Sequence, residues 1–130
     1  MQWNKICITT ILIGCLFLYQ GCQSSIRSGG ADAQAKYAWG ALKAELDYPL
    51  ETTYRAAKKA AEQLELSIYT DRHDEVAGLI TARDAQNDEV KIKLEALPQS
   101  RTIMTVRVGT VGDKNKSHVI FNQVLDNLRR

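Results

Sequence analysis

Residues 89–97, EVKIKLEAL, alternate apolar and charged side chains over nearly their whole length. The apolar positions that share one face are Val90, Ile92, Leu94 and Ala96. The other face carries Lys91, Lys93 and Glu95. Because successive side chains of a strand point to opposite sides, this pattern predicts a β-strand in a sheet that is covered on one face only.

Four other runs have strand character: residues 37–48, 66–72, 76–84 and 101–109. The first is expected to turn Leu42, Ala44 and Leu46 inward, and the last to turn Met104, Val106 and Val108 inward. Turn residues at 72–75, 85–88 and 98–100 separate the later strands. Connections this short join antiparallel neighbours, because a parallel return needs a much longer crossover.

Two amphipathic helices are expected to cover the apolar face. One starts at Pro49, which suits the first turn of a helix, and its apolar stripe is Leu50, Thr53, Tyr54, Ala57, Ala61 and Leu64. The other is expected to be capped by Ser117, with the stripe Ile120, Phe121, Val124, Leu125 and Leu128. The order strand, helix, four strands, helix predicts an α+β two-layer sandwich, with a mainly antiparallel sheet of about five strands and both helices on one face.

The amino-terminal part of the chain differs from the rest. Residues 6–19 are mostly apolar, a run too short to cross a bilayer as a helix but typical of the hydrophobic region of a signal peptide. A stretch rich in Ser, Gly, Ala and Gln follows and predicts a flexible linker. We therefore expect a signal peptide at 1–21, a modified cysteine and linker at 22–36, and a single α+β domain at 37–130.

The pair Gly21–Cys22 at the end of the hydrophobic region resembles a bacterial lipoprotein signal. In such signals a diacylglycerol is attached to the cysteine sulfur, a peptidase cuts before the cysteine, and the new amino terminus is acylated. The resemblance implies a lipid anchor at Cys22, and two or more acyl chains hold a protein stably to a membrane. A cleaved secretory signal or an uncleaved amino-terminal anchor is one alternative. Cys15 in "LIGC" is the other, because it fits the lipoprotein pattern better residue by residue. It would leave a hydrophobic region of only about eight residues and an unpaired Cys22.

Three segments of the domain are similar to a family of small Gram-negative bacterial lipoproteins classed only as a domain of unknown function. They are the strand with Tyr37 and Gly40, the helix start at Pro49, and the "RVGTVGD" loop before the last helix. The resemblance covers nearly all of the chain after the linker and implies an envelope lipoprotein with this α+β fold. It brings no activity, cofactor or catalytic residue. The resemblance also implies that Gln23, a residue other than Asp after the cysteine, permits export to the outer membrane. We expect the protein in the inner leaflet of that membrane, facing the periplasm.

The sequence of the domain carries no catalytic or metal-binding signature. His73 stands among carboxylates in "DRHDE", but a metal site needs three or four convergent ligands, and a turn is expected there. Ser117 and His118 are adjacent, so at a helix start they point about 100° apart and do not form a nucleophile–base pair. The 17 basic and 15 acidic residues are interspersed, which does not favour nucleic acid as a partner. We expect no enzyme activity, no cofactor and no metal.

The loop between the last strand and the last helix is the candidate ligand or partner site. Its residues are Arg107, Gly109, Gly112, Lys114, Lys116 and Ser117. The glycines permit positive φ, so backbone N–H groups can converge, and the lysines and the helix start add positive potential.

The uncovered sheet face is a second candidate docking surface, with Arg83, Lys91, Lys93, Glu95 and Arg107. Tyr37, Trp39 and Tyr48 are expected to pack in the core or at its rim. If Trp39 and Tyr37 face outward instead, they would form a contact surface beside the membrane or a partner. The expected function is a non-enzymatic, membrane-tethered interaction or structural module in the periplasm with an envelope protein as partner. The alternative is a periplasmic binding module for a small anionic ligand at the Gly109–Ser117 loop.

Overall fold

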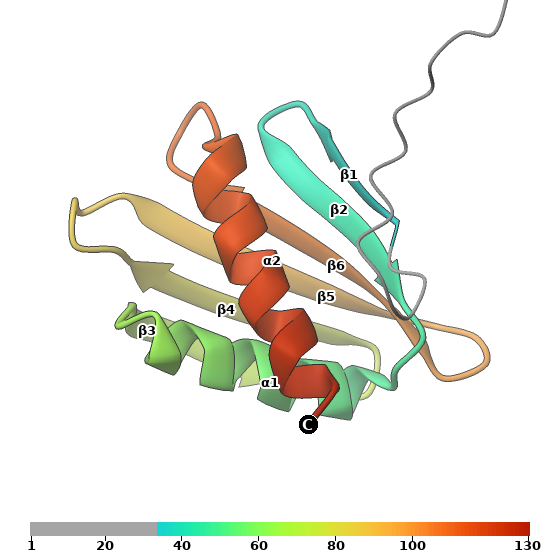
Figure 1. Ribbon diagram of the computed structural model, residues 1–130. Helices are drawn as coiled ribbons and strands as arrows, with labels where there is room; N and C mark the ends of the chain where they lie inside the picture. The colour runs from blue at the N-terminus through green and yellow to red at the C-terminus, as the bar shows by residue number, and fades with distance from the viewer. Residues whose placement is uncertain (1–33) are drawn as a thin grey trace, which may run out of the picture. The chain divides into compact units, whose positions relative to one another are not determined.

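The computed structural model describes residues 34–130, which lie within one compact unit, Ala31–Arg130. Its elements are β1 (Ala35–Ala38), β2 (Ala41–Leu46), α1 (Leu50–Gln63), β3 (Ser67–His73), β4 (Ala77–Arg83), β5 (Glu89–Leu97), β6 (Arg101–Val108) and α2 (Lys114–Leu128). The six strands form one sheet in the order β1-β2-β6-β5-β4-β3, with every neighbouring pair antiparallel. Both helices lie on the same side of this sheet (Figure 1). The predicted α+β two-layer fold is confirmed.

The run predicted as one strand over residues 37–48 is a β-hairpin, so the sheet has six strands instead of about five. The chain turns at Trp39 and Gly40, whose φ angles are 54° and 75°. Positive φ at both central residues is the geometry of two-residue turns that match the twist of the flanking strands. The predicted alternation holds within β2, because Leu42, Ala44 and Leu46 are all buried.

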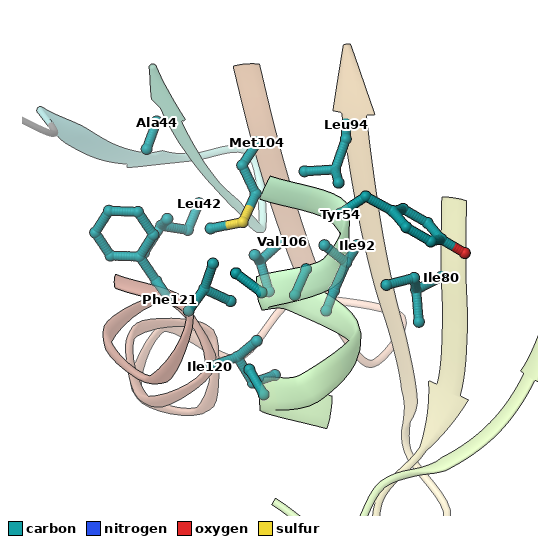
Figure 2. Packing of buried hydrophobic residues seen from close by; sticks show 14 of the residues in the cluster. Leu42, Ala44, Tyr54, Ile80, Ile92, Leu94, Met104, Val106, Ile120 and Phe121 are labelled. Atoms are coloured by element: carbon teal, nitrogen blue, oxygen red, sulfur yellow. The ribbon is translucent and has the colours of Figure 1, made fainter. Parts of the chain in front are cut away.

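The hydrophobic core lies where the apolar stripes of the two helices meet the inner side of the sheet (Figure 2). α1 packs over β3, β4 and β5, whereas α2 packs over β2 and β6. Ala57, Ala60 and Ala61 are fully buried, and their small side chains let α1 lie close to the strands. Met104, Val106 and Val108 are buried in β6, as the sequence predicts.

The helix starts differ from the prediction by a few residues. α2 begins at Lys114 with Asp113 as its N-cap, and the Asp113 carboxylate accepts a hydrogen bond from the Lys116 backbone N–H at 3.0 Å. Ser117 is therefore not the cap. It is fully buried in the helix, and its hydroxyl donates to the Asp113 carbonyl oxygen at 2.6 Å. The helix starts earlier than its apolar stripe, because the first turn of α2 consists of polar residues. In α1, Pro49 is the N-cap and lies just before the first turn.

The predictions for the signal peptide, Cys15 and Cys22 lie outside the described residues. Within residues 34–130, neither helix is long and apolar enough to cross a membrane.

Candidate functional site

The side of the sheet that faces away from the two helices carries most of the positive charge of the described residues. We call this side the open face. Its basic residues, placed by the strand register, are Lys36, Lys43, Arg72, Arg83, Lys91, Lys93, Arg101 and Arg107. Its acidic residues are Glu45, Glu89 and Glu95. Elsewhere in residues 34–130, acidic residues outnumber basic ones. The nearly neutral composition therefore hides one strongly basic surface.

Two pairs of like charges lie directly opposite each other on the open face. Lys36 in β1 faces Lys43 in β2, and Lys91 in β5 faces Arg107 in β6. Among the described residues, no carboxylate lies within ion-pair distance of Lys36 or Lys43, whereas Lys91 is 3.1 Å from Glu89. Like charges at directly opposed positions destabilise a sheet. Natural sequences break such local rules chiefly at functional sites, so these pairs make the open face a candidate binding surface.

One hollow of the open face, of about 520 Å³, is lined in part by Arg72, Leu79, Lys93 and Glu95. Two further hollows each contain an opposed like-charged pair. The larger, of about 560 Å³, is lined by Glu89, Lys91, Lys93, Thr105, Arg107, Gly109 and Thr110. The other, of about 450 Å³, is lined from the β1–β2 hairpin and β6 and includes Lys36, Lys43, Trp39 and Ile103. The sequence singles out Lys91, Lys93 and Arg107. It does not predict the pair of Lys36 and Lys43, because a single strand over residues 37–48 cannot bring these two lysines opposite each other as the hairpin does.

Trp39 is exposed, which corrects the prediction that it packs at the core or its rim. Its side chain is 97% exposed, because the hairpin turn places it at the tip between β1 and β2. Tyr37 and Tyr48 are half-buried and pack against the core, as predicted. Positive φ is uncommon for a bulky residue and is strained. The protein thus holds a large aromatic side chain in solvent on a strained backbone.

The Trp39 turn is held in place by the loop that precedes α2. A Cβ atom at Gly40 would lie 2.2 Å from the Val111 carbonyl oxygen, and one at Gly112 would lie 2.2 Å from the Gly40 carbonyl oxygen. The two backbones therefore touch, and only glycine fits at either position. Val111 is itself 86% exposed. The contact brings together, at one end of the domain, the β1–β2 turn and the loop before α2 (Figure 1). Trp39 on the turn and Val111 on the loop are both exposed.

One lysine of the predicted loop site is already bound by other side chains of the protein. Lys116 Nζ lies 2.6 Å from Asp84 Oδ2 and 2.9 Å from Asp88 Oδ2, and it also donates to Gln86 Oε1 at 3.2 Å. Gly109 and Gly112 have the expected positive φ. Arg107 projects from the open face and donates to the Thr110 carbonyl oxygen. Of the two lysines, only Lys114 is exposed and makes no ion pair with the described residues, so this loop offers less free charge than the sequence indicated.

The contacts of Lys116 shift two pKa values in opposite directions. The hydrogen bond from Lys116, together with backbone N–H groups of Asp88 and Gln86, holds the pKa of the Asp84 carboxyl below its usual value. The carboxylates of Asp84 and Asp88 raise the pKa of Lys116. The Asp84 contribution to stability is therefore complete above about pH 4 and is lost as the pH falls through its lowered pKa. The Lys116 contribution is lost only at strongly alkaline pH.

We predict that replacing Lys116 with methionine lowers the thermal unfolding midpoint at neutral pH, because two neighbouring carboxylates lose their shared cation. As the pH falls through the lowered pKa of Asp84, the midpoints of the wild type and of Lys116→Met should converge, since the Asp84 carboxyl then loses the charge that pairs with Lys116. Thermal scans followed by circular dichroism measure this difference. Lys114→Met is the matched control and should leave the midpoint unchanged. A constant gap between wild type and Lys116→Met at all pH values would contradict this account.

The side chains of the "DRHDE" segment contact different parts of the domain and do not converge on one site. Asp71 pairs with Lys58 of α1 at 2.6 Å, and His73 Nε2 lies 3.0 Å from Glu51 Oε2 while its ring stacks on Tyr54. Asp74 Oδ1 accepts hydrogen bonds from the backbone N–H groups of Val76 and Ala77, as expected for a turn. Among residues 34–130, no group of three or more metal-ligating side chains gathers at one place.

These features define a two-layer α+β domain with a basic open face and an exposed tryptophan at one end. A family model described as "Protein of unknown function (DUF3568)" matches residues 5–127 of the chain. The match spans nearly the whole chain, so the protein belongs to this family. No curated protein matches the chain in a sequence search.

Proposed function

We propose that the protein is a lipid-anchored lipoprotein of the Gram-negative envelope and acts as a non-enzymatic interaction module. The observation that carries the interaction role is the open face, where most of the basic side chains of the described residues gather and where Lys36 lies opposite Lys43 with no carboxylate partner among those residues. Shallow hollows on a broad charged surface suit docking better than the enclosed binding of a small substrate. The docking surface of the module is therefore the open face.

The anchor is supported by the order of segments in the sequence. A short apolar run ends at Gly21–Cys22, and a stretch rich in small and polar residues connects it to the domain. The family match begins at residue 5, so the apolar run belongs to the matched region as well as the domain. With Gln23 after the cysteine, we propose that the anchored protein resides in the inner leaflet of the outer membrane and faces the periplasm. The binding of a small anionic ligand at Gly109–Ser117 is less well supported, because Asp84 and Asp88 already hold Lys116.

We predict that the protein incorporates radiolabelled palmitate in Gram-negative cells and that Cys22→Ser abolishes the label. The reason is that, in this proposal, the diacylglycerol is attached to the sulfur atom of Cys22. Cys15→Ser is the matched control and should retain the label. Label is measured after immunoprecipitation and electrophoresis.

Each other outcome of the labelling has a definite meaning. Loss of label with Cys15→Ser alone would keep the anchor and move the cleavage site to Cys15. A wild type that takes up no label would overturn the lipoprotein proposal.

A further inference from the structure

We propose that the open face and the Trp39 turn dock on the surface of a bilayer that contains anionic lipids. The cations of the open face lie against the phosphate groups, and Trp39 enters the interface between head groups and acyl chains. This inference deepens the proposed function and rests on it in one respect, namely that the domain is held close to a membrane. The contacts that carry it belong wholly to residues 34–130.

The distribution of charge favours a planar anionic surface. Every one of the six strands contributes at least one cation to the open face, from Lys36 in β1 to Arg72 in β3. Basic residues spread over a surface are attracted to a membrane with anionic head groups, and each lysine or arginine near the surface adds to the attraction. Phosphates that settle between Lys36 and Lys43, and between Lys91 and Arg107, would relieve the repulsion within both pairs.

Trp39 supplies an independent observation that also points to a bilayer. Tryptophan is enriched at membrane–water interfaces, where its ring sits at the level of the head groups. Trp39 lines the hollow that also contains Lys36 and Lys43, so the ring borders the basic surface directly. The contact between Gly40 and Gly112 fixes the turn that carries it, and Val111 stands exposed in the same contact. An exposed aromatic ring beside cations combines the two interactions that hold a protein on an anionic bilayer.

The length of chain before the domain allows this contact. Twelve residues lead from Cys22 to Gln34, and a chain of that length spans at most about 40 Å. It enters the domain at β1, which is an edge strand of the sheet and carries Lys36 of the open face. A domain tethered at Cys22 therefore stays within reach of the bilayer, with its basic edge nearest the tether.

The test uses Trp39 as a fluorescent reporter in the full chain. The sequence has two tryptophans, and the proposed cleavage before Cys22 removes Trp3, so Trp39 is the only one in the processed protein. Trp3→Phe gives the same single reporter in any chain that keeps the signal peptide. The full chain is reconstituted into vesicles of phosphatidylcholine alone, or of phosphatidylcholine mixed with phosphatidylglycerol, each with a brominated lipid as quencher. In the anionic vesicles we expect the Trp39 emission to shift to shorter wavelength and to be quenched, and high salt should reverse both changes. In the neutral vesicles the emission should remain that of an exposed tryptophan.

Charge variants separate the open face from a general effect of charge. Lys36→Gln combined with Lys43→Gln should reduce the quenching in anionic vesicles to the level found in neutral ones. Arg55→Gln combined with Lys59→Gln is the matched control, because it removes the same charge from α1 on the other layer, and it should retain the quenching. These four side chains are at the surface, so circular dichroism should show an unchanged fold in both variants.

Three results would overturn the proposal. If the Trp39 emission in anionic vesicles stays that of an exposed ring, the open face does not bind lipid, and the proposal is overturned. A protein partner, which the vesicles lack, would then be favoured. Equal quenching in neutral and anionic vesicles would remove the role of the cations, and equal losses in the two double variants would remove the role of the open face. These results are independent of the anchor, since palmitate label without quenching would leave the lipoprotein proposal intact, and quenching without label would leave the present one intact.

Discussion

Gly112→Ala is expected to lower the free energy of unfolding by roughly 2–6 kcal/mol, because two costs add at one atom. The φ angle of Gly112 is 99°, a conformation that strains any residue with a side chain. The new methyl group would also lie 2.2 Å from the Gly40 carbonyl oxygen and 2.3 Å from the Gly40 Cα. Those are backbone atoms, so the β1–β2 turn and the loop before α2 must move apart to admit the methyl group.

Gly109→Ala separates the two costs. Gly109 has a similar positive φ of 72°, but the nearest atom to its Cβ position is Asp88 Oδ1 at 4.0 Å. We therefore expect only the strain of the left-handed conformation, about 1–2 kcal/mol. Urea unfolding followed by circular dichroism measures both variants. Equal losses at Gly109 and Gly112 would show that the contact between the two turns contributes nothing to stability.

The same substitution connects the fold to the proposed membrane contact. The Gly40–Gly112 contact holds the turn on which Trp39 stands, so a displaced loop should also displace the ring. We expect weaker quenching of Trp39 by lipid in Gly112→Ala, even under conditions in which the domain remains folded. This effect on binding follows from position and does not require the loss of any charge on the open face.

Phe121→Ala is expected to lower the free energy of unfolding by about 3–5 kcal/mol. The Phe121 side chain is only 4% exposed and projects from α2 into the core, on the side where Leu42 and Met104 lie (Figure 2). α2 covers β2 and β6, so the cavity would open over the strands that join the two halves of the sheet. Small domains have total stabilities of about 5–15 kcal/mol, and a loss of this size is a large part of that.

Val119 offers the control on the same helix. Its side chain is 55% exposed, so Val119→Ala should change stability by no more than about 0.5 kcal/mol. Chemical denaturation of the two variants under identical conditions measures the difference. If Phe121→Ala is no less stable than Val119→Ala, then α2 does not bury its apolar stripe in solution.

Much of the local structure follows from the sequence, because side-chain direction has a fixed period in each kind of element. Alternation in residues 89–97 identifies which face of β5 is buried, and Val90, Ile92 and Leu94 are indeed buried, although Ala96 is exposed. The stripes of the two helices are determined in the same way. Short polar connections determine that β3 to β6 pair antiparallel, because no crossover fits between them.

The sheet order and the proposed binding surface, by contrast, depend on contacts between residues distant in the chain. β2 pairs with β6, and no local pattern in either strand specifies that partner. The turn at Trp39 carries only Gly40 as a signal, since tryptophan is not a turn residue. Lys116 pairs with Asp84 and Asp88, which lie 32 and 28 positions earlier in the chain. Because of these ion pairs, Lys116 is not available as a free cation in the predicted loop site.

The basic character of the open face shows the same division. From the sequence, the charges are mixed and the net charge is only +2. Alternation determines that Lys43, Lys91 and Lys93 point away from the core, because side chains of a strand alternate strictly between its two faces. Only the tertiary structure decides that the cations of six strands stand together on one surface, because that depends on which strands lie side by side and in which register.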